Sequence, residues 1–342
     1  MTGSMRAAVL YDIDDIRIEE RPIPALADGD VLVKTQASGI CSGDVMPWYI
    51  RRKAPVVFGH EPAGTIVEVR GASSFEVGDR VFVHHHAPCF SCRACERGDY
   101  VQCATWRSSA LEPGAMAEYF RVPAVNLSDT LRLPPTLDAV GGSLVEPLAC
   151  VVKSLRRAQP SPSDTVYVIG LGVMGLMHCA LVQARGYRVL ASDFSESRRA
   201  LASAIGAEPI DAAGDVLDRV RSRTAGRGAE IVICGPGSPQ ALAHALDAVA
   251  PGGTVVMFTP LEPGTPFTFD QSAAYFRDIA LVSSYSCGPD DTRDALALLA
   301  AGVITPDAIG VELRSFADVA EAYADLRFGR AVKPIVVFPG GS

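Results

Sequence analysis

Five apolar runs that alternate with longer helical stretches, between Leu148 and about Ser286, constrain the fold of this 342-residue chain most. The runs are Val166 to Gly170, Arg188 to Ser192, Ile231 to Gly235, Gly253 to Thr259 and Ile279 to Ser284. Strands that alternate with helices form a parallel sheet, because each helix carries the chain back to the same edge. The sequence therefore predicts an α/β fold with helices on both faces of a doubly wound sheet.

A glycine-rich turn follows the first of these runs. In Gly170-Leu-Gly172-Val-Met-Gly175, the first glycine permits a tight turn, the second lets a pyrophosphate approach the backbone, and the third allows close helix packing. The helix N-terminus that follows offers N–H groups and a positive dipole to phosphates. The next run ends at Asp193, eighteen residues after Gly175, where an acid bonds the adenosine ribose hydroxyls. We interpret this segment as a dinucleotide site.

Asp193 also bears on which dinucleotide is bound. Its carboxylate would repel a 2′-phosphate, which favours NAD over NADP. Arg198 and Arg199 follow closely and soften that preference, although a solvated first helical turn is the alternative interpretation for both arginines.

The rest of the chain is organised differently. Up to about Pro147, short strand-like runs are separated by Pro, Gly and Asp clusters, which indicates a mostly β domain with an irregular cysteine-rich lobe. A last strand, Lys333 to Phe338, is expected to return to that domain. We therefore expect one domain from residues 1–148 and 287–342, with the cofactor-binding domain, residues 149–286, inserted between them.

Four of the nine cysteines fall within fifteen residues, as Cys89-x2-Cys92-x2-Cys95-x7-Cys103. The N-terminus lacks the features of a secretory signal, so we expect a cytoplasmic protein in which close cysteines bind metal rather than form disulfides. Four thiolates at these spacings can enclose a tetrahedral zinc ion and leave no position for substrate. The sequence predicts a structural zinc site here; four unrelated buried cysteines are the alternative.

A second group of potential ligands is dispersed along the chain: Cys41, His60, Glu61 and Glu146. One thiolate, one imidazole and a carboxylate form an ordinary shell for catalytic zinc with one position open. Spacing alone does not bring these residues together. Taken singly, Cys41 can be a small buried residue, His60 a core histidine and Glu146 a helix N-terminal acid.

Charge and hydropathy exclude several partners. The net charge is −8, from 31 basic and 39 acidic residues, and no strongly basic run occurs, which argues against nucleic acid or an anionic membrane as the main partner. Val166 to Ala184 contains no charged residue, but its spaced glycines favour a buried strand running into a helix over a membrane span. Small molecules are the expected ligands.

Together these motifs resemble the zinc-dependent medium-chain alcohol dehydrogenase family, in particular its sorbitol, threonine and polyol dehydrogenase branch. The resemblance covers essentially the whole chain and includes Gly59-His60-Glu61-Pro62-Ala63-Gly64, Val77-Gly78-Asp79-Arg80-Val81, Gly114-Ala-Met-Ala-Glu118-Tyr119 and Glu146-Pro147-Leu148-Ala149. It implies a GroES-like β domain with a structural zinc lobe beside a Rossmann domain. It also implies a homodimer or homotetramer.

The resemblance also assigns residues. It makes Cys41, His60 and Glu61 ligands of the catalytic zinc, Glu146 a further ligand or close neighbour, and Asp44 the acceptor that orients His60. Cofactor contacts are assigned to Gly170, Leu171, Gly172, Val173, Met174, Gly175, Asp193, Arg198, Thr259, Ser284 and Tyr285.

Two positions depart from the family pattern. Gly43 stands where a Ser or Thr hydroxyl usually carries the substrate proton outward, and Met46 where a histidine often ends the relay. An ungapped match places His85 at a pocket position that is often apolar, so we expect a polar pocket with a group that titrates near neutrality. The alternative is that His84, His85 and His86 merely flank the zinc lobe.

The sequence thus predicts a zinc-dependent oxidoreductase that moves a hydride between NAD(H) and a polar secondary alcohol or ketone of the polyol, sugar or cyclitol class. One alternative is a dehydrogenase of an amino-sugar or aminocyclitol intermediate in antibiotic biosynthesis. Another, motivated by Gly43 and Met46, is a catalytically impaired protein that binds NAD and zinc.

Overall fold

The computed structural model describes residues 3–340, so the outermost ends of the predicted first domain lie outside the described residues. The chain divides into two compact units: unit 1 runs to Ala149 and resumes at Cys287, and unit 2 comprises Cys150–Ser286. Among the described residues, no helix has the length and apolar character needed to cross a membrane.

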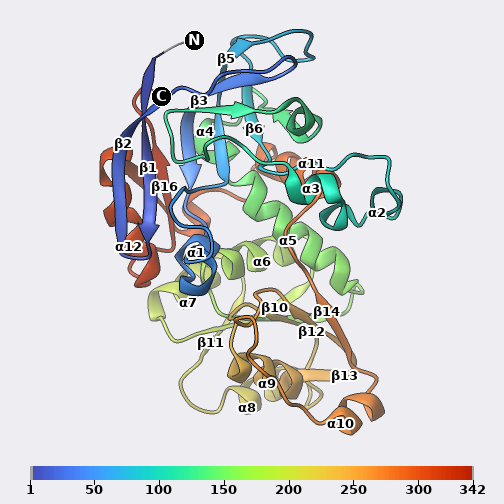
Figure 1. Cartoon of the computed structure of the whole chain (residues 1–342). Coiled ribbons are helices and arrows are strands. Elements are labelled where there is room, and N and C mark those ends of the chain that lie inside the picture. Colours follow the sequence, from blue (N-terminus) through green and yellow to red (C-terminus); the bar gives the residue numbers. More distant parts are fainter. Residues whose placement is uncertain (1–2, 341–342) are drawn as a thin grey trace. The chain divides into compact units, whose positions relative to one another are not determined.

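Unit 2 contains a six-stranded parallel sheet in the order β11-β10-β9-β12-β13-β14 (Figure 1). Its strands are β9 (Thr165–Ile169), β10 (Arg188–Asp193), β11 (Glu208–Asp211), β12 (Ala229–Cys234), β13 (Val249–Met257) and β14 (Ala280–Ser283). The helices are α6 (Val173–Ala184), α7 (Glu196–Ile205), α8 (Val216–Arg223), α9 (Pro239–Ala248) and α10 (Gln271–Phe276); α5 (Val145–Ala158) leads into the unit. The strand order reverses between β9 and β12, and such a switch point in a doubly wound sheet is where ligands bind.

The five predicted strands are present, and the sixth, β11, was missed. It has only four residues, Glu208–Asp211, and includes a proline, so it lacks the length and the apolar run that mark a buried strand. A proline is tolerated there because β11 lies at the edge of the sheet.

Unit 1 is mainly β. Its larger sheet has the order β15-β16-β3-β5-β6-β8, with β7 also paired to β3, and a smaller sheet has the order β2-β1-β4. The strands are β1 (Ser4–Asp12), β2 (Asp15–Pro22), β3 (Val31–Gly39), β4 (Val56–Val57), β5 (Glu61–Val69), β6 (Arg80–Val83), β7 (Tyr119–Val122), β8 (Thr130–Arg132), β15 (Val311–Ser315) and β16 (Lys333–Val337). The helices are α1 (Pro47–Ile50), α2 (Arg93–Glu96), α3 (Ala104–Ser108), α4 (Ala139–Gly142), α11 (Pro289–Ala300) and α12 (Val319–Arg327).

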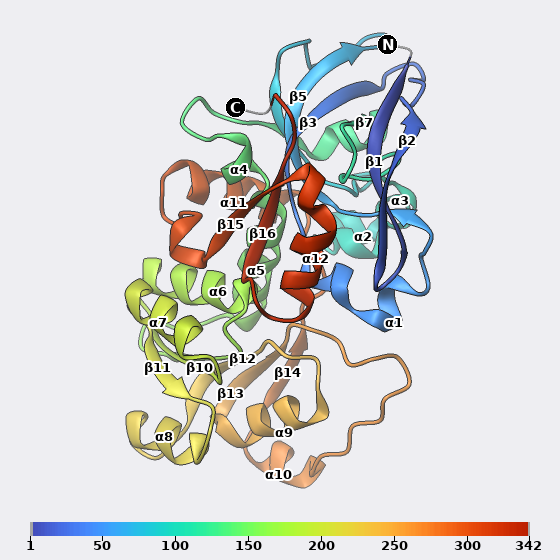
Figure 2. The same cartoon turned by 90° about the vertical axis from the view of Figure 1, so that its left-hand side faces the viewer.

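The last strand returns to the N-terminal sheet, as predicted from the sequence. β16 pairs antiparallel with β3 and parallel with β15, and α12 packs along it (Figure 2). Apolar side chains of β1, α12 and β16 share one core that includes Leu10, Tyr323 and Val336. The C-terminal segment is therefore an integral part of unit 1.

Candidate functional site

In the larger sheet of unit 1, the C-terminal end of β3 lies beside the N-terminal ends of its two neighbours, β5 and β16. β3 ends at Gly39, two residues before Cys41, and Gly39 lies opposite Glu61 at the start of β5. β16, on the other side of β3, begins at Lys333. Antiparallel pairing places the end of β3 beside the starts of both neighbours. Residues far apart in the sequence, including His60 just before β5, are thereby brought together.

The sulfur of Cys41, an imidazole nitrogen of His60 and a carboxylate oxygen of Glu61 lie within 4.8 Å of one another. Asp44, which is buried, places Oδ1 3.5 Å from His60 Nδ1, and its Oδ2 has no hydrogen-bond partner. Burial raises the pKa of the Cys41 thiol. A divalent cation among these groups would stabilise their deprotonated forms, so this donor set suits zinc.

At the departure from the family pattern, Gly43 donates its backbone N–H to Cys41 Sγ over 3.3 Å. A Cβ at Gly43 would contact only that sulfur, at an ordinary 3.5 Å. Space therefore does not require glycine at this position.

Glu61 forms a buried ion pair with Lys333, a residue that sequence reasoning did not assign to the site. Their side chains are 1% and 0% exposed, and Lys333 Nζ also donates to the carbonyl of Ile40 over 3.1 Å. Burial raises the pKa of Glu61, which Lys333 partly opposes. One feature of the sequence could have identified Lys333: it is one of few lysines in the chain and begins a strand of otherwise apolar residues. Gly39 is required here, because a Cβ would overlap the Glu61 carboxylate.

Glu146, in the first turn of α5, was expected to be a further ligand of the catalytic zinc or a close neighbour of it. Its carboxylate lies with ring nitrogens of His84 and His85, all within 4.8 Å, and not in the group of Cys41, His60 and Glu61. The His60 and His85 ring centroids are 4.8 Å apart. The two groups therefore adjoin each other.

The expectation that His85 titrates near neutrality is wrong. Burial lowers its pKa well below the usual value, and the charges of His60, His86, His84 and Lys53 lower it further. His85 is therefore a neutral imidazole at neutral pH, and one of its nitrogens can serve as an acceptor.

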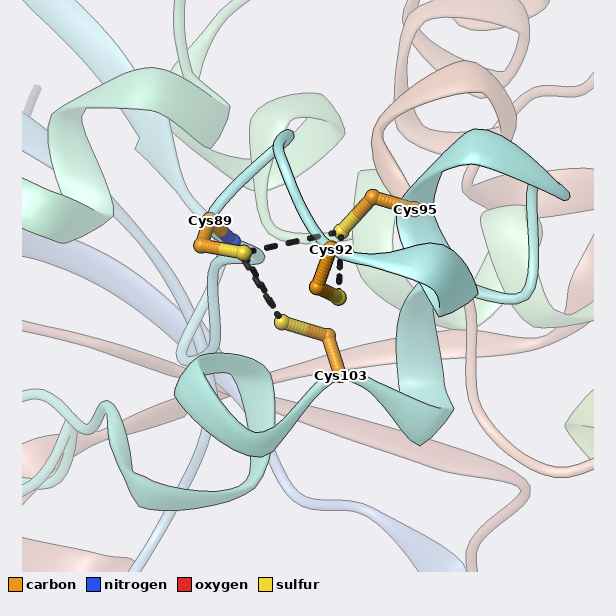
Figure 3. A group of neighbouring side chains, drawn as sticks. All are labelled: Cys89, Cys92, Cys95 and Cys103. Atoms are coloured by element: carbon orange, nitrogen blue, oxygen red, sulfur yellow. Dashed lines mark hydrogen bonds between the residues drawn. The ribbon is translucent and has the colours of Figure 1, made fainter.

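The four clustered cysteines form a compact group of sulfur atoms in the cysteine lobe, residues 88–106 (Figure 3). Sγ–Sγ distances are 3.5 Å for Cys92–Cys95, 3.6 Å for Cys89–Cys103 and 4.0 Å for Cys89–Cys95. A tetrahedral zinc ion with bonds of about 2.3 Å holds its sulfur atoms about 3.8 Å apart. The arrangement therefore fits a closed, structural zinc site.

In unit 2, the glycine turn connects β9 to α6. Gly170 has a φ of +85°, in the region that favours glycine, and a Cβ on Gly175 would overlap the carbonyl oxygen of Gly170. A Cβ on Gly172 would meet nothing within 4 Å, so the backbone there is open to approach. Leu171 and Val173 are buried, whereas Met174 is half-buried, so the turn offers mainly backbone groups.

Asp193 stands at the end of β10, beside that turn. One carboxylate oxygen accepts the Leu171 N–H at 2.7 Å, and the other accepts the Ser195 N–H at 2.8 Å. Arg198 places a guanidinium nitrogen 4.0 Å from this carboxylate. Asp193 thus fixes the turn and also presents a negative charge at the carboxyl edge of the sheet.

The other residues expected at the cofactor follow the carboxyl ends of neighbouring strands. Thr259 comes two residues after β13, and Ser284 and Tyr285 directly follow β14. Ser284 is buried with its hydroxyl unpartnered, whereas Tyr285 is exposed. All three lie at the strand ends where ligands of such sheets bind.

Comparison with protein-family models gives two matches. Residues 27–134 match the alcohol dehydrogenase GroES-like domain, and residues 173–301 match the zinc-binding dehydrogenase domain. The two matches fall in the order that the resemblance implied, and the second extends beyond residue 286.

Individual relatives agree along their whole length. The chain is 30% identical to D-xylulose reductase A of Aspergillus oryzae, over 98% of this chain and 97% of the relative. The alcohol dehydrogenase TADH of Thermus sp. ATN1 has a TM-score of 0.87 and 30% identity, and the alignment covers 98% of this chain and 100% of that one. A zinc-binding dehydrogenase from Sinorhizobium meliloti, bound to NADP, has a TM-score of 0.88 and 28% identity, with 98% and 99% covered.

Proposed function

This chain belongs to the zinc-dependent alcohol dehydrogenase family, and from that premise we propose that it transfers a hydride between NAD(H) and a polar secondary alcohol or its ketone. The convergence of Cys41, His60 and Glu61 carries the proposal, because three such ligands leave a zinc position open for substrate oxygen. The names of the xylulose reductase relatives support a polyol substrate. Residues 1–148 and 287–342 would carry the zinc sites, and residues 149–286 the cofactor.

Residues of unit 1 would bind the catalytic zinc, orient its ligands and balance their charge. Cys41, His60 and Glu61 would hold zinc, which when bound supplies Lewis-acid stabilisation of charge on the substrate oxygen. Asp44 would orient the His60 ring as acceptor for its second nitrogen, as carboxylates behind ligand histidines do. Lys333 neutralises Glu61 and so limits the negative charge that this carboxylate presents to the substrate.

The residues of unit 2 would bind the dinucleotide. The open backbone at Gly172 and the start of α6 suit the pyrophosphate, and Asp193 suits the adenosine ribose. Thr259, Ser284 and Tyr285 would lie near the nicotinamide, which carries the hydride when bound. We propose NAD rather than NADP, because the 2′-phosphate would meet the Asp193 carboxylate, which the Arg198 guanidinium approaches only to 4.0 Å.

Asp193→Ser is expected to lower the kcat/KM ratio of NAD to NADP by about 10- to 100-fold. The reason is that charge-assisted hydrogen bonds to the ribose are worth about 1.5–3 kcal/mol, and the substitution removes these bonds as well as the repulsion of a 2′-phosphate. Steady-state kinetics with both cofactors measure the ratio. Asp211→Asn, at the end of the next strand, is the matched control, and an unchanged ratio in Asp193→Ser would contradict the assignment.

The function itself is tested by NADH absorbance with zinc-loaded enzyme, NAD and a panel of xylitol, sorbitol, myo-inositol, an aminocyclitol and ethanol. We expect turnover with at least one cyclic or acyclic polyol and a kcat/KM for ethanol at least about 100-fold lower, a difference of about 2.7 kcal/mol. Cys41→Ser should abolish turnover, whereas Cys179→Ser, a buried cysteine of unit 2, should not. Saturable NADH binding by zinc-loaded enzyme with no turnover on any polyol would instead identify a protein that binds both without catalysis.

We propose that the enzyme is a homodimer or homotetramer in the cytoplasm. The nine cysteines are thiols and none is in a disulfide, which suits a reducing compartment. β14 forms one edge of the unit 2 sheet, and Tyr275, Phe276 and Leu281 around it are exposed, a combination that invites pairing with a second copy. Light scattering is expected to give two or four times 36.1 kDa, and Leu281→Lys should lower it; a 36.1 kDa species in the wild type would contradict the proposal.

A further inference from the structure

We propose that His84, His85 and Glu146 form a second position for a divalent metal ion in unit 1, beside the group of Cys41, His60 and Glu61. The inference relies on the proposed function only for the identity of the other two zinc positions. Two imidazoles and a carboxylate are a common ligand set for zinc. Their donor atoms already lie within 4.8 Å of one another, and His84 and Glu146 are buried.

A carboxylate orients the His84 ring, as is usual for histidines that bind metal. Its Nδ1 lies 2.6 Å from Asp129 Oδ2, and the other oxygen of that carboxylate accepts the Thr292 hydroxyl at 2.7 Å. A carboxylate behind one ring nitrogen fixes the tautomer, so that Nε2 carries the free lone pair. All three side chains are fully buried, so this orientation is rigid.

The second ring nitrogen of His84, Nε2, faces a further potential metal ligand. Cys287 Sγ lies 3.6 Å from His84 Nε2. In a tetrahedral zinc site with bonds of about 2.0–2.1 Å to nitrogen and 2.3 Å to sulfur, the two atoms stand about 3.6 Å apart. Cys287 therefore lies at ligand distance from His84, although it belongs to a separate group with Glu146 and Cys150 rather than to the group of His84, His85 and Glu146.

His85 supplies an independent sign of a missing partner. Its Nδ1 is buried and makes no hydrogen bond. The backbone around it is fixed, because Asn126 Nδ2 donates to the carbonyls of both His84 and His85, at 3.3 Å and 3.1 Å. A buried donor or acceptor without a partner is rare in folded proteins, and a bound cation would satisfy it.

Buried acidic side chains surround the two groups. Four carboxylates near the two groups are buried: Asp44, Glu61, Asp129 and Glu146. Among residues 3–340 the one buried lysine or arginine is Lys333, which Glu61 already binds; the half-exposed Arg293 stands 3.8 Å from Asp129.

Metal content tests the proposal. The full-length enzyme is stripped of loosely bound metal by dialysis, titrated with ZnCl2, passed through a desalting column and measured by mass spectrometry. We expect three zinc ions per chain for the wild type and two for His85→Gln. The control His86→Gln removes the neighbouring imidazole, which bonds to Ser109 and lies outside the group, and should retain three.

Two zinc ions per chain in the wild type would overturn the inference, even if the enzyme turns over polyols. Three ions without turnover would uphold it and defeat the proposed function instead. If His85→Gln keeps three zinc ions and only its KM for the polyol rises, His85 contacts the substrate instead of a metal. That outcome would refute the proposed metal site. A zinc-edge anomalous map of wild-type crystals needs no variant, and should show a third peak between His84, His85 and Glu146.

Discussion

Cys92→Ser is expected to remove one zinc ion per chain and to unfold the cysteine lobe. The lobe consists of short helices around a small core in which Cys95, Val101, Cys103 and Trp106 are the buried apolar residues. So little apolar surface does not stabilise a fold without metal, and structural zinc contributes about 10–16 kcal/mol of apparent binding energy in isolated zinc peptides. A hydroxyl in place of the thiolate forfeits a large part of that energy.

Mass spectrometry for zinc and limited proteolysis measure these two effects. New cleavage sites should appear within residues 88–106, while unit 2 stays protected. Cys234→Ser, in β12 of unit 2, is the control and should leave both zinc content and cleavage unchanged. Full zinc content in Cys92→Ser would show that these four cysteines do not share a metal.

Lys333→Met is expected to lower the free energy of unfolding by about 3–5 kcal/mol, because it leaves the buried Glu61 carboxylate without its counter-charge. Glu61 would then be driven to the protonated form, since burial already raises its pKa and the charge that opposes this shift is gone. Urea denaturation of protein stripped of the metal at Cys41, His60 and Glu61, followed by fluorescence, measures the loss.

A second substitution separates the ion pair from simple packing. Lys333→Met combined with Glu61→Gln removes both charges, so it should recover much of the stability lost in the single variant. Lys34→Met, a half-buried lysine of β3, should cost less than about 1 kcal/mol. If the double variant is no more stable than Lys333→Met, the buried charge is not the cause.

Much of the fold follows from local sequence signals. The alternation of apolar runs and helices predicted the parallel sheet of unit 2, and the apolar run after Lys333 predicted the strand that returns to unit 1. β11 was not predicted, because four residues that include a proline show little periodicity in hydropathy. β15 was not predicted, because polar residues interrupt Val311–Ser315, which lies at the edge of its sheet. Short edge strands are defined by their pairing partner more than by their own residues.

The candidate site was predictable where ligands lie in a recognisable motif. Cys41, His60 and Glu61 come together as expected, whereas Glu146 lies with His84 and His85. Lys333 and Asp129 were not identified, because their buried partners are distant in the sequence. Such pairs depend on strand order and register, which a single sequence without homologues does not reveal.

The return of β16 has a consequence for how the protein is made. Glu61 and Lys333 are 272 residues apart in the chain, so the thiol, imidazole and carboxylate of the metal group leave the ribosome long before their counter-charge. Until β16 docks, β3 lacks one neighbour and Glu61 lacks the ammonium group of Lys333. A nascent chain therefore has an unpaired edge at β3, and the group of Cys41, His60 and Glu61 lacks the positive charge of Lys333. The site therefore gains its correct charge only after this late strand has been made and has docked on β3.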